Sequence, residues 1–111
     1  DMLGQFENLT GRKFQAMRIS AGGAKADNWV QLKANVMNLS MERVANLQAS
    51  AVGAAINAAV GIGFYQDYDD AIAHMVQVDR VFDPDPEMVK IYQEQSEKFH
   101  EFHVKGPCFF L

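Results

Sequence analysis

The feature that most constrains this chain is a pair of glycines between a predicted strand and a predicted helix. Residues 13–20 carry apolar side chains such as Phe14 and Met17 and contain no proline, which is typical of a strand. The run ends at Gly22 and Gly23, and a helical pattern opens immediately afterwards. Glycine lets the backbone turn sharply and lets another group approach the main chain closely. The sequence therefore predicts a strand, a tight turn and a helix in direct succession.

The start of that helix is a plausible seat for an anion. The first N–H groups of a helix have no intrahelical partner, and the helix dipole places partial positive charge at that end. A strand, a small-residue turn and a helix N-terminus together can hold a phosphate or a nucleotide. Lys25 follows the glycine pair by only two positions, so the segment matches neither the dinucleotide-binding motif nor the P-loop. It also fits a plain tight turn before a packing helix, so this segment alone does not decide the function.

The residues after the turn predict a parallel β-α-β unit. One helical face is formed by Trp29, Leu32, Val36 and Leu39. Lys33 and Asn35 lie off that face. Residues 41–46 are expected to form a second short strand. The intervening helix is long enough to be the crossover that parallel strands require.

Most of the remaining chain is expected to be helical. The predicted helices are a short one from Met2 to Leu9, an alanine-rich one over residues 49–61, one beginning at Asp67, and one beginning at Pro86 with Asp85 as its cap. Residues 78–83 are expected to be extended or irregular. Two parallel strands with four to five helices make an α/β domain with few strands, so we expect the chain to be part of a larger unit.

Composition limits the partners and the cellular compartment. A net charge of −4 gives no basic surface for nucleic acid or for an anionic membrane. The single cysteine, Cys108, excludes an internal disulfide and fits a reducing compartment. No apolar run approaches the roughly 20 residues that span a bilayer, and no signal peptide is visible. We therefore expect a cytoplasmic protein of one small domain.

Three blocks of the sequence resemble the FGGY carbohydrate kinases. Residues 19–39, with Ser-Ala-Gly-Gly-Ala and Gln-Leu-Lys-Ala-Asn-Val, resemble the family's adenosine-binding segment, whose usual form is Ser-Gly-Gly-Gly-Ala followed by Gln-x-x-Ala-Asp-Val. Residues 51–55, Ala-Val-Gly-Ala-Ala, resemble its Ala-Leu-Gly-Ala-Ala helix, and residues 81–86 resemble the stretch before its last helix. The order and spacing of the blocks agree over about residues 1–103.

The resemblance implies a fold and an activity. Residues 1–103 would be the C-terminal portion of the nucleotide-binding domain, the second of two actin-like (ribonuclease H-like) domains, and residues 104–111 a C-terminal tail. Members of the family transfer the γ-phosphoryl group of ATP to a sugar or polyol hydroxyl, most commonly of a pentulose such as xylulose, with Mg²⁺ on the phosphates. The catalytic aspartate, the Mg²⁺ ligands and the sugar pocket would lie in segments absent here, so this segment alone is expected to be inactive.

The resemblance also implies five nucleotide-binding residues. Gly22, Gly23 and Ala24 would line the nucleotide with their backbone. Asp27 and Asn28 match positions at which glycerol kinases carry a pair of asparagines, and they would contact the adenosine. No catalytic residue and no metal ligand is assigned within this chain.

Two departures from the family pattern bear on that site. Ala21 stands in place of the first glycine of the triplet, and Ala26 stands in place of a frequent serine. If the site requires a positive φ at residue 21, a methyl group there strains the turn and weakens contact with ATP.

Two other interpretations stay open. The chain could be a non-catalytic interaction module with a degenerate nucleotide site, or an unrelated small α/β binding domain that is complete at this length. In the kinase interpretation, the missing strands leave an exposed sheet edge, so we expect the chain to form a homo-oligomer.

Overall fold

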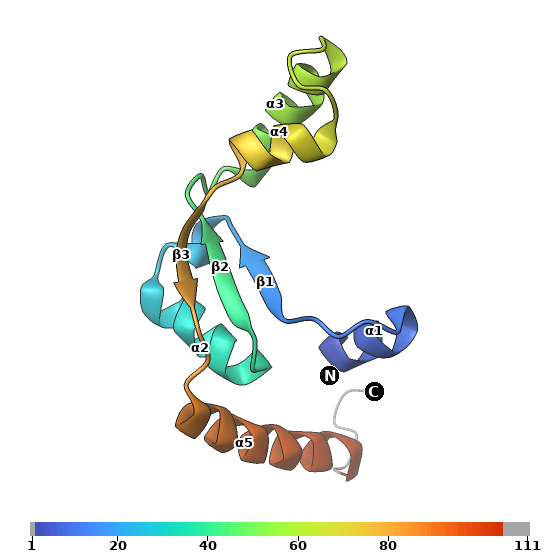
Figure 1. The fold of residues 1–111 in the computed structure, drawn as a ribbon. Helices are drawn as coiled ribbons and strands as arrows, with labels where there is room; N and C mark the ends of the chain where they lie inside the picture. Colours follow the sequence, from blue (N-terminus) through green and yellow to red (C-terminus); the bar gives the residue numbers. More distant parts are fainter. Residues whose placement is uncertain (1, 106–111) are drawn as a thin grey trace, which may run out of the picture.

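The predicted strand, turn and helix form the centre of the molecule in the computed structural model (Figure 1). β1 (Ala16–Ile19) pairs in parallel with β2 (Ser40–Val44), and α2 (Asp27–Met37) connects them. The parallel unit predicted from the sequence is therefore confirmed. Both strands are shorter than the predicted ranges 13–20 and 41–46.

The structure describes residues 2–105, and the other helical elements agree with the predicted ones. They are α1 (Met2–Thr10), the single 3-10 turn η1 (Gly22–Ala24), α3 (Ala49–Gly61), α4 (Tyr68–Met75) and α5 (Pro86–Lys105). The Asp67 side chain caps α4 by accepting a hydrogen bond from the Asp70 N–H at 2.8 Å. The Asp85 side chain accepts one from the Glu87 N–H at 3.0 Å. The predicted Asp85 cap is therefore formed, and Asp67, predicted to begin its helix, is the cap one residue before it.

A third strand, β3 (Val78–Phe82), was expected only as an extended or irregular segment. It pairs with β2 in an antiparallel register that places Phe82 opposite Met41 and Arg80 opposite Arg43. The sheet order is β1-β2-β3, so β2 is the central strand. The α/β class holds, and the sheet is one strand wider than predicted.

The buried core lies between α2 and the sheet. Its members are Ala24, Val30, Ala34, Leu39, Met41 and Phe82. The predicted helix face is displaced from this core, because Trp29 and Val36 are half exposed. They line an apolar groove beside the free edge of β1 instead. Leu39 lies beyond the helix, which ends where Asn38 adopts a left-handed conformation.

A buried asparagine joins α5 to α2. The Asn35 Oδ1 atom accepts hydrogen bonds from the Asp85 N–H at 2.8 Å and from Gln31 Nε2 at 3.0 Å. Asn35 is 5% exposed, although the sequence placed it off the apolar face. The predicted tail, 104–111, begins within α5, and residues 106–111 lie outside the described residues.

The molecule is elongated. A compact chain of this length has a radius of gyration of about 13 Å, whereas the value here is 18.0 Å. The α3–α4 hairpin extends from one end of the sheet and α1 and α5 lie toward the other (Figure 1). Helix α1 has no buried residue. These elements therefore leave much apolar surface uncovered. None of the helices within residues 2–105 has the length and apolar character needed to cross a membrane.

Candidate functional site

The glycine turn follows the carboxyl end of β1 and leads directly into α2. The Ala21 N–H donates to the Leu47 carbonyl at 3.1 Å, which fixes the turn to the segment after β2. The Ala24 N–H closes the turn by donating to the Ala21 carbonyl at 3.0 Å. Gly22 and Gly23 are exposed, so their main chain is accessible to a ligand.

Ala21 adopts a conformation that favours glycine. Its φ is 68° and its ψ is −169°, a combination that is essentially restricted to glycine because of clashes made by a Cβ atom. A residue held there costs of order 1–3 kcal/mol. The positive φ considered from the sequence is therefore present, and the departure from glycine at this position introduces strain into the turn.

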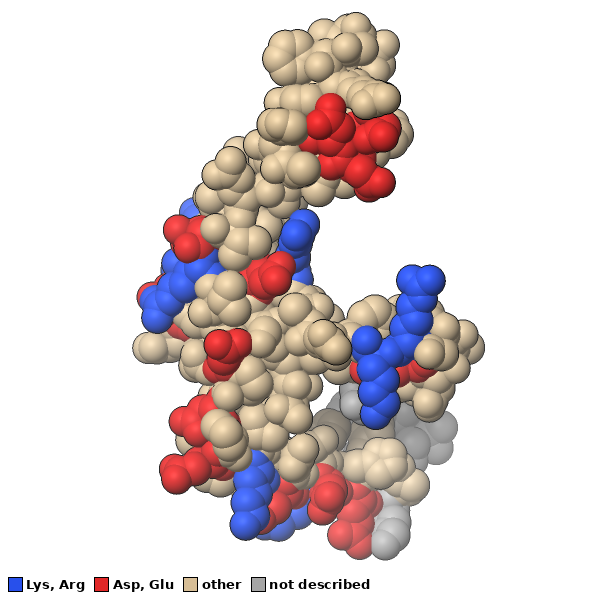
Figure 2. All heavy atoms as spheres, in the orientation of Figure 1, with Lys and Arg blue, Asp and Glu red and all other residues tan. Residues whose placement is uncertain are grey.

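Asp27, the first residue of α2, is held by two arginines. Arg43 Nη1 donates to Asp27 Oδ1 at 2.5 Å, and Arg80 Nη1 donates to Asp27 Oδ2 at 2.8 Å. Arg43 also donates to Asp79 Oδ2 through Nε at 3.0 Å and Nη2 at 2.9 Å. These four side chains form the charge cluster of Asp27, Arg43, Asp79 and Arg80. Figure 2 shows positive and negative side chains gathered beside α2 and β3. The sequence analysis did not identify this cluster.

We expect acid to weaken the folded state through Asp27. The hydrogen bond from Arg43, assisted by Arg80, holds the pKa of Asp27 below its ordinary value of 3.8. The carboxylate therefore stabilises the folded chain above pH 3.8, and this contribution disappears as the pH falls through the lower folded-state pKa. Urea unfolding between pH 7 and pH 3 should show a smaller loss of stability for Asp27→Asn than for the unsubstituted chain. An unchanged pH dependence would contradict this expectation.

The other candidate residues lie around the turn in different environments. Ala24 is fully buried, and its carbonyl accepts a hydrogen bond from Arg43 Nη1 at 3.4 Å. Asn28 is exposed in the first turn of α2. Trp29 lies against the turn, since a Cβ atom built on Gly23 would be 3.6 Å from its Nε1. All five predicted residues thus lie in the turn and the first turn of α2, with the glycines and Asn28 open to solvent.

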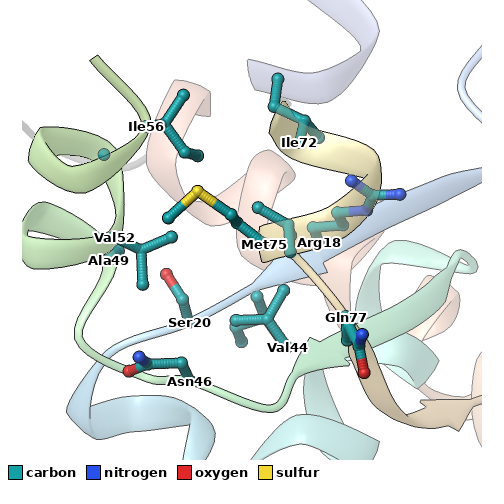
Figure 3. Close-up of a pocket in the computed structure, with 13 residues that line it drawn as sticks. Arg18, Ser20, Val44, Asn46, Ala49, Val52, Ile56, Ile72, Met75 and Gln77 are labelled. Atoms are coloured by element: carbon teal, nitrogen blue, oxygen red, sulfur yellow. The ribbon is translucent and has the colours of Figure 1, made fainter. Parts of the chain in front are cut away.

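A cavity of about 350 Å³ lies at the carboxyl ends of β1 and β2, beneath α3 and α4 (Figure 3). Its walls are mainly apolar and include Val44, Val52 and Met75, and its polar lining residues are Arg18, Ser20, Asn46 and Gln77. Ligands of open α/β sheets bind at this end of the strands. The sequence analysis did not identify this cavity, although the two parallel strands indicated the edge at which it lies.

The small-residue helix α3 has an open face. A Cβ atom added at Gly53 would meet no atom within 4 Å. Ile56 is its one buried residue. The side of α3 at Gly53 is therefore uncovered within the described part of the chain.

Metal-binding groups are not assembled in this segment. Among residues 2–105, no three His, Cys, Asp or Glu side chains are placed to hold a metal ion. The described residues thus do not form a site for Mg²⁺ on their own.

Comparison with known proteins places this arrangement in a family. Residues 1–62 match the model described as the FGGY family of carbohydrate kinases, C-terminal domain. A xylulose kinase from Staphylococcus epidermidis is 31% identical over 84 residues, which are 76% of this chain and 17% of that protein. The chain thus spans about a fifth or less of the length of such relatives.

Solved structures share the fold. The ligand-bound xylulose kinase from Lactobacillus acidophilus matches 94% of this chain and 21% of its own, with a TM-score of 0.80 and 24% identity. A Plasmodium falciparum glycerol kinase with ADP matches 90% of this chain and 20% of its own, with a TM-score of 0.72 and 18% identity. The predicted partial actin-like fold is confirmed. The chain belongs to the FGGY family of carbohydrate kinases and corresponds to part of their C-terminal domain.

Proposed function

We propose that this chain is the nucleotide-binding C-terminal segment of an ATP-dependent carbohydrate kinase. The observation that carries the proposal is the exposed Gly22-Gly23 main chain, which lies between the carboxyl end of a parallel strand and the N-terminus of α2. This arrangement favours a nucleotide because the main chain can be approached closely and the helix end attracts negative charge. The solved glycerol kinase of the same fold, with ADP, supports the choice of ligand.

The five proposed contacts have different roles. Gly22 and Gly23 present their main chain to the adenosine. Asn28 offers an exposed side-chain amide and a main-chain N–H in the first turn of α2. Ala24 is buried, so it supports the turn from beneath through its carbonyl. Both carboxylate oxygens of Asp27 are occupied by arginines, so its contribution comes from its main-chain N–H.

The proposed reaction is transfer of the γ-phosphoryl group of ATP to a hydroxyl of a sugar or polyol. A pentulose such as xylulose is the favoured acceptor, because xylulose kinases are among the relatives in both sequence and structure. Bound Mg²⁺ would neutralise charge on the phosphates. The described residues of this chain position the adenosine of ATP, with the N-terminus of α2 attracting the negatively charged phosphates, and leave the Mg²⁺ ligands, the acceptor and the transfer step to the rest of the kinase.

The rest of the kinase would also cover the apolar surfaces left open here. The free edge of β1 lies between the groove lined by Trp29 and Val36 and the cavity beneath α3. Domain residues that precede α1 in such kinases would pair with that edge and fill both hollows. Where they are absent, we expect two copies of the chain to associate through the same edge, because an unpaired strand offers free hydrogen-bonding groups.

Replacing Gly23 by valine is expected to weaken ATP binding about tenfold or more, because the side chain occupies the space that the nucleotide needs. A Cβ atom at this position makes only ordinary contacts, with the side chains of Trp29 and Lys33. Calorimetric titration with ATP to millimolar concentrations measures the effect.

Gly61→Val is the matched control for this titration. Gly61 is exposed at the end of α3, has open space around it and lies on the hairpin away from the turn. The Gly61→Val variant should leave the ATP affinity unchanged. Equal affinity for the Gly23 variant and the unsubstituted chain would contradict a nucleotide site at the turn.

A second candidate function is a non-catalytic module with a degenerate nucleotide site. The strained backbone of Ala21 favours this candidate, because glycine would form the same turn without strain and so support tighter ATP binding. Assays of this segment within a whole kinase of the family distinguish the two. Phosphorylation of a pentulose or polyol supports the kinase, and negligible ATP binding with no phosphorylation supports the degenerate module.

A further inference from the structure

We propose that Arg43 is a positioning residue that holds the glycine turn in place relative to β3, and that nucleotide affinity depends on it. The inference rests on the proposed function and extends it to a residue that does not touch the nucleotide. Arg43 stands on the central strand β2, and its guanidinium reaches three separate segments. These are the Ala24 carbonyl in the turn, Asp27 at the start of α2, and Asp79 on β3.

The guanidinium group of Arg43 connects β3 to the glycine turn. The Nε and Nη2 atoms both donate to Asp79 Oδ2, at 3.0 and 2.9 Å, which holds the guanidinium group against β3. The remaining Nη1 atom then points at the turn, where it serves both Asp27 and the Ala24 carbonyl. The Arg43 side chain is only 16% exposed, so these bonds are partly shielded from water. A lysine could not make this set of contacts, because its ammonium is a single point charge.

Arg80 provides an internal comparison. It also binds Asp27, at 2.8 Å, and its guanidinium also stacks over the ring of Phe82. Within residues 2–105, Arg80 donates neither to the Ala24 carbonyl nor to Asp79, and its side chain is 56% exposed. The two arginines therefore share a carboxylate and an aromatic ring, and only Arg43 connects the turn to the third strand.

The test compares Arg43→Met with Arg80→Met in the same 111-residue chain. Both substitutions remove one positive charge close to Asp27, so both lower the long-range attraction for ATP. ATP affinity is measured by titration with the fluorescence of Trp29, the single tryptophan, which lies beside Gly23. We expect about a tenfold loss of affinity for Arg43→Met and less than about a twofold loss for Arg80→Met.

A second measurement reports the turn without a nucleotide. Hydrogen exchange of the Ala24 and Lys25 amides follows the bonds that close the turn, to Ala21 and Gly22. These two amides should exchange faster in Arg43→Met while the amides of the α2 interior keep their rates. If the Arg43 variant does not fold, Asp79→Asn replaces it, because that change removes the charge of the anchor on β3 and leaves Arg43 in place. It should lower ATP affinity about threefold and speed the same two amides.

The outcomes separate this proposal from the proposed function. Equal losses of ATP affinity in the two methionine variants, or faster exchange throughout the chain, would overturn the positioning role. Failure of the unsubstituted chain to bind ATP would overturn the proposed function, and the exchange rates would then decide alone whether Arg43 holds the turn. A selective loss in the Arg43 variant with selective exchange at the turn supports both.

Discussion

Replacing Phe82 by alanine is expected to lower the free energy of unfolding by about 3–5 kcal/mol, the largest effect of any single substitution considered for this chain. Phe82 is 3% exposed, stands opposite Met41 across the sheet and belongs to the core that α2 covers. Its ring also lies beneath the guanidinium groups of Arg80, at 4.6 Å, and Arg43, at 5.3 Å. Truncation therefore removes core packing and the surface on which the charge cluster rests.

Chemical denaturation of the purified chain measures this loss. Val81→Ala is the control, because Val81 is the neighbouring residue of β3 and is 50% exposed. It should cost less than about 1 kcal/mol. Similar losses for the two variants would mean that β3 is not packed against the core as described.

Replacing Ala21 by glycine is expected to raise the free energy of unfolding by about 1–2 kcal/mol. Glycine adopts a φ of 68° without the clash that a Cβ atom makes, so the strain in the folded turn is relieved. The gain is smaller than the strain itself, because glycine also gives the unfolded chain more conformational freedom. In the proposed nucleotide site, the same substitution should strengthen ATP binding.

The control for Ala21→Gly is Ala51→Gly, which introduces the same residue at an exposed position inside α3. There glycine should cost about 1 kcal/mol, because it weakens a helix. Opposite signs in the two denaturation curves support the left-handed backbone at residue 21. A loss of stability at both positions would contradict it.

Local signals in the sequence predicted much of the fold. The glycine pair marked the turn, and Asp67 and the Asp85 cap marked where two helices begin, because each signal depends on residues adjacent in the chain. The parallel pairing of β1 and β2 followed from the length of the helix between them.

Features that depend on distant partners were not predicted. The strand β3 contains Asp79, which disfavours a strand by local propensity and is accommodated here by its ion pair with Arg43. The buried face of α2 was misplaced because the apolar Trp29 faces the free edge of β1. The spacing of apolar residues shows which side chains can be buried. It does not show whether the residues that bury them belong to the same segment.

The candidate site also has a part that local sequence predicts and a part that depends on distant residues. Gly22, Gly23 and Asn28 lie within one short stretch, so a single motif was enough to single them out. Arg43 and Asp79 lie 36 positions apart in sequence and meet only through the antiparallel pairing of β2 and β3. The support beneath the turn therefore required the folded structure.

Binding of the nucleotide at the glycine turn can be tested by an ATP titration followed by amide-resolved NMR of the isotopically labelled chain. We expect saturable shifts that are largest at residues 21–29, with the Gly22 and Gly23 amides moving most and those of the α3–α4 hairpin unmoved. Saturable shifts centred elsewhere, or no shift at residues 21–29 at millimolar ATP in a folded chain, would contradict it.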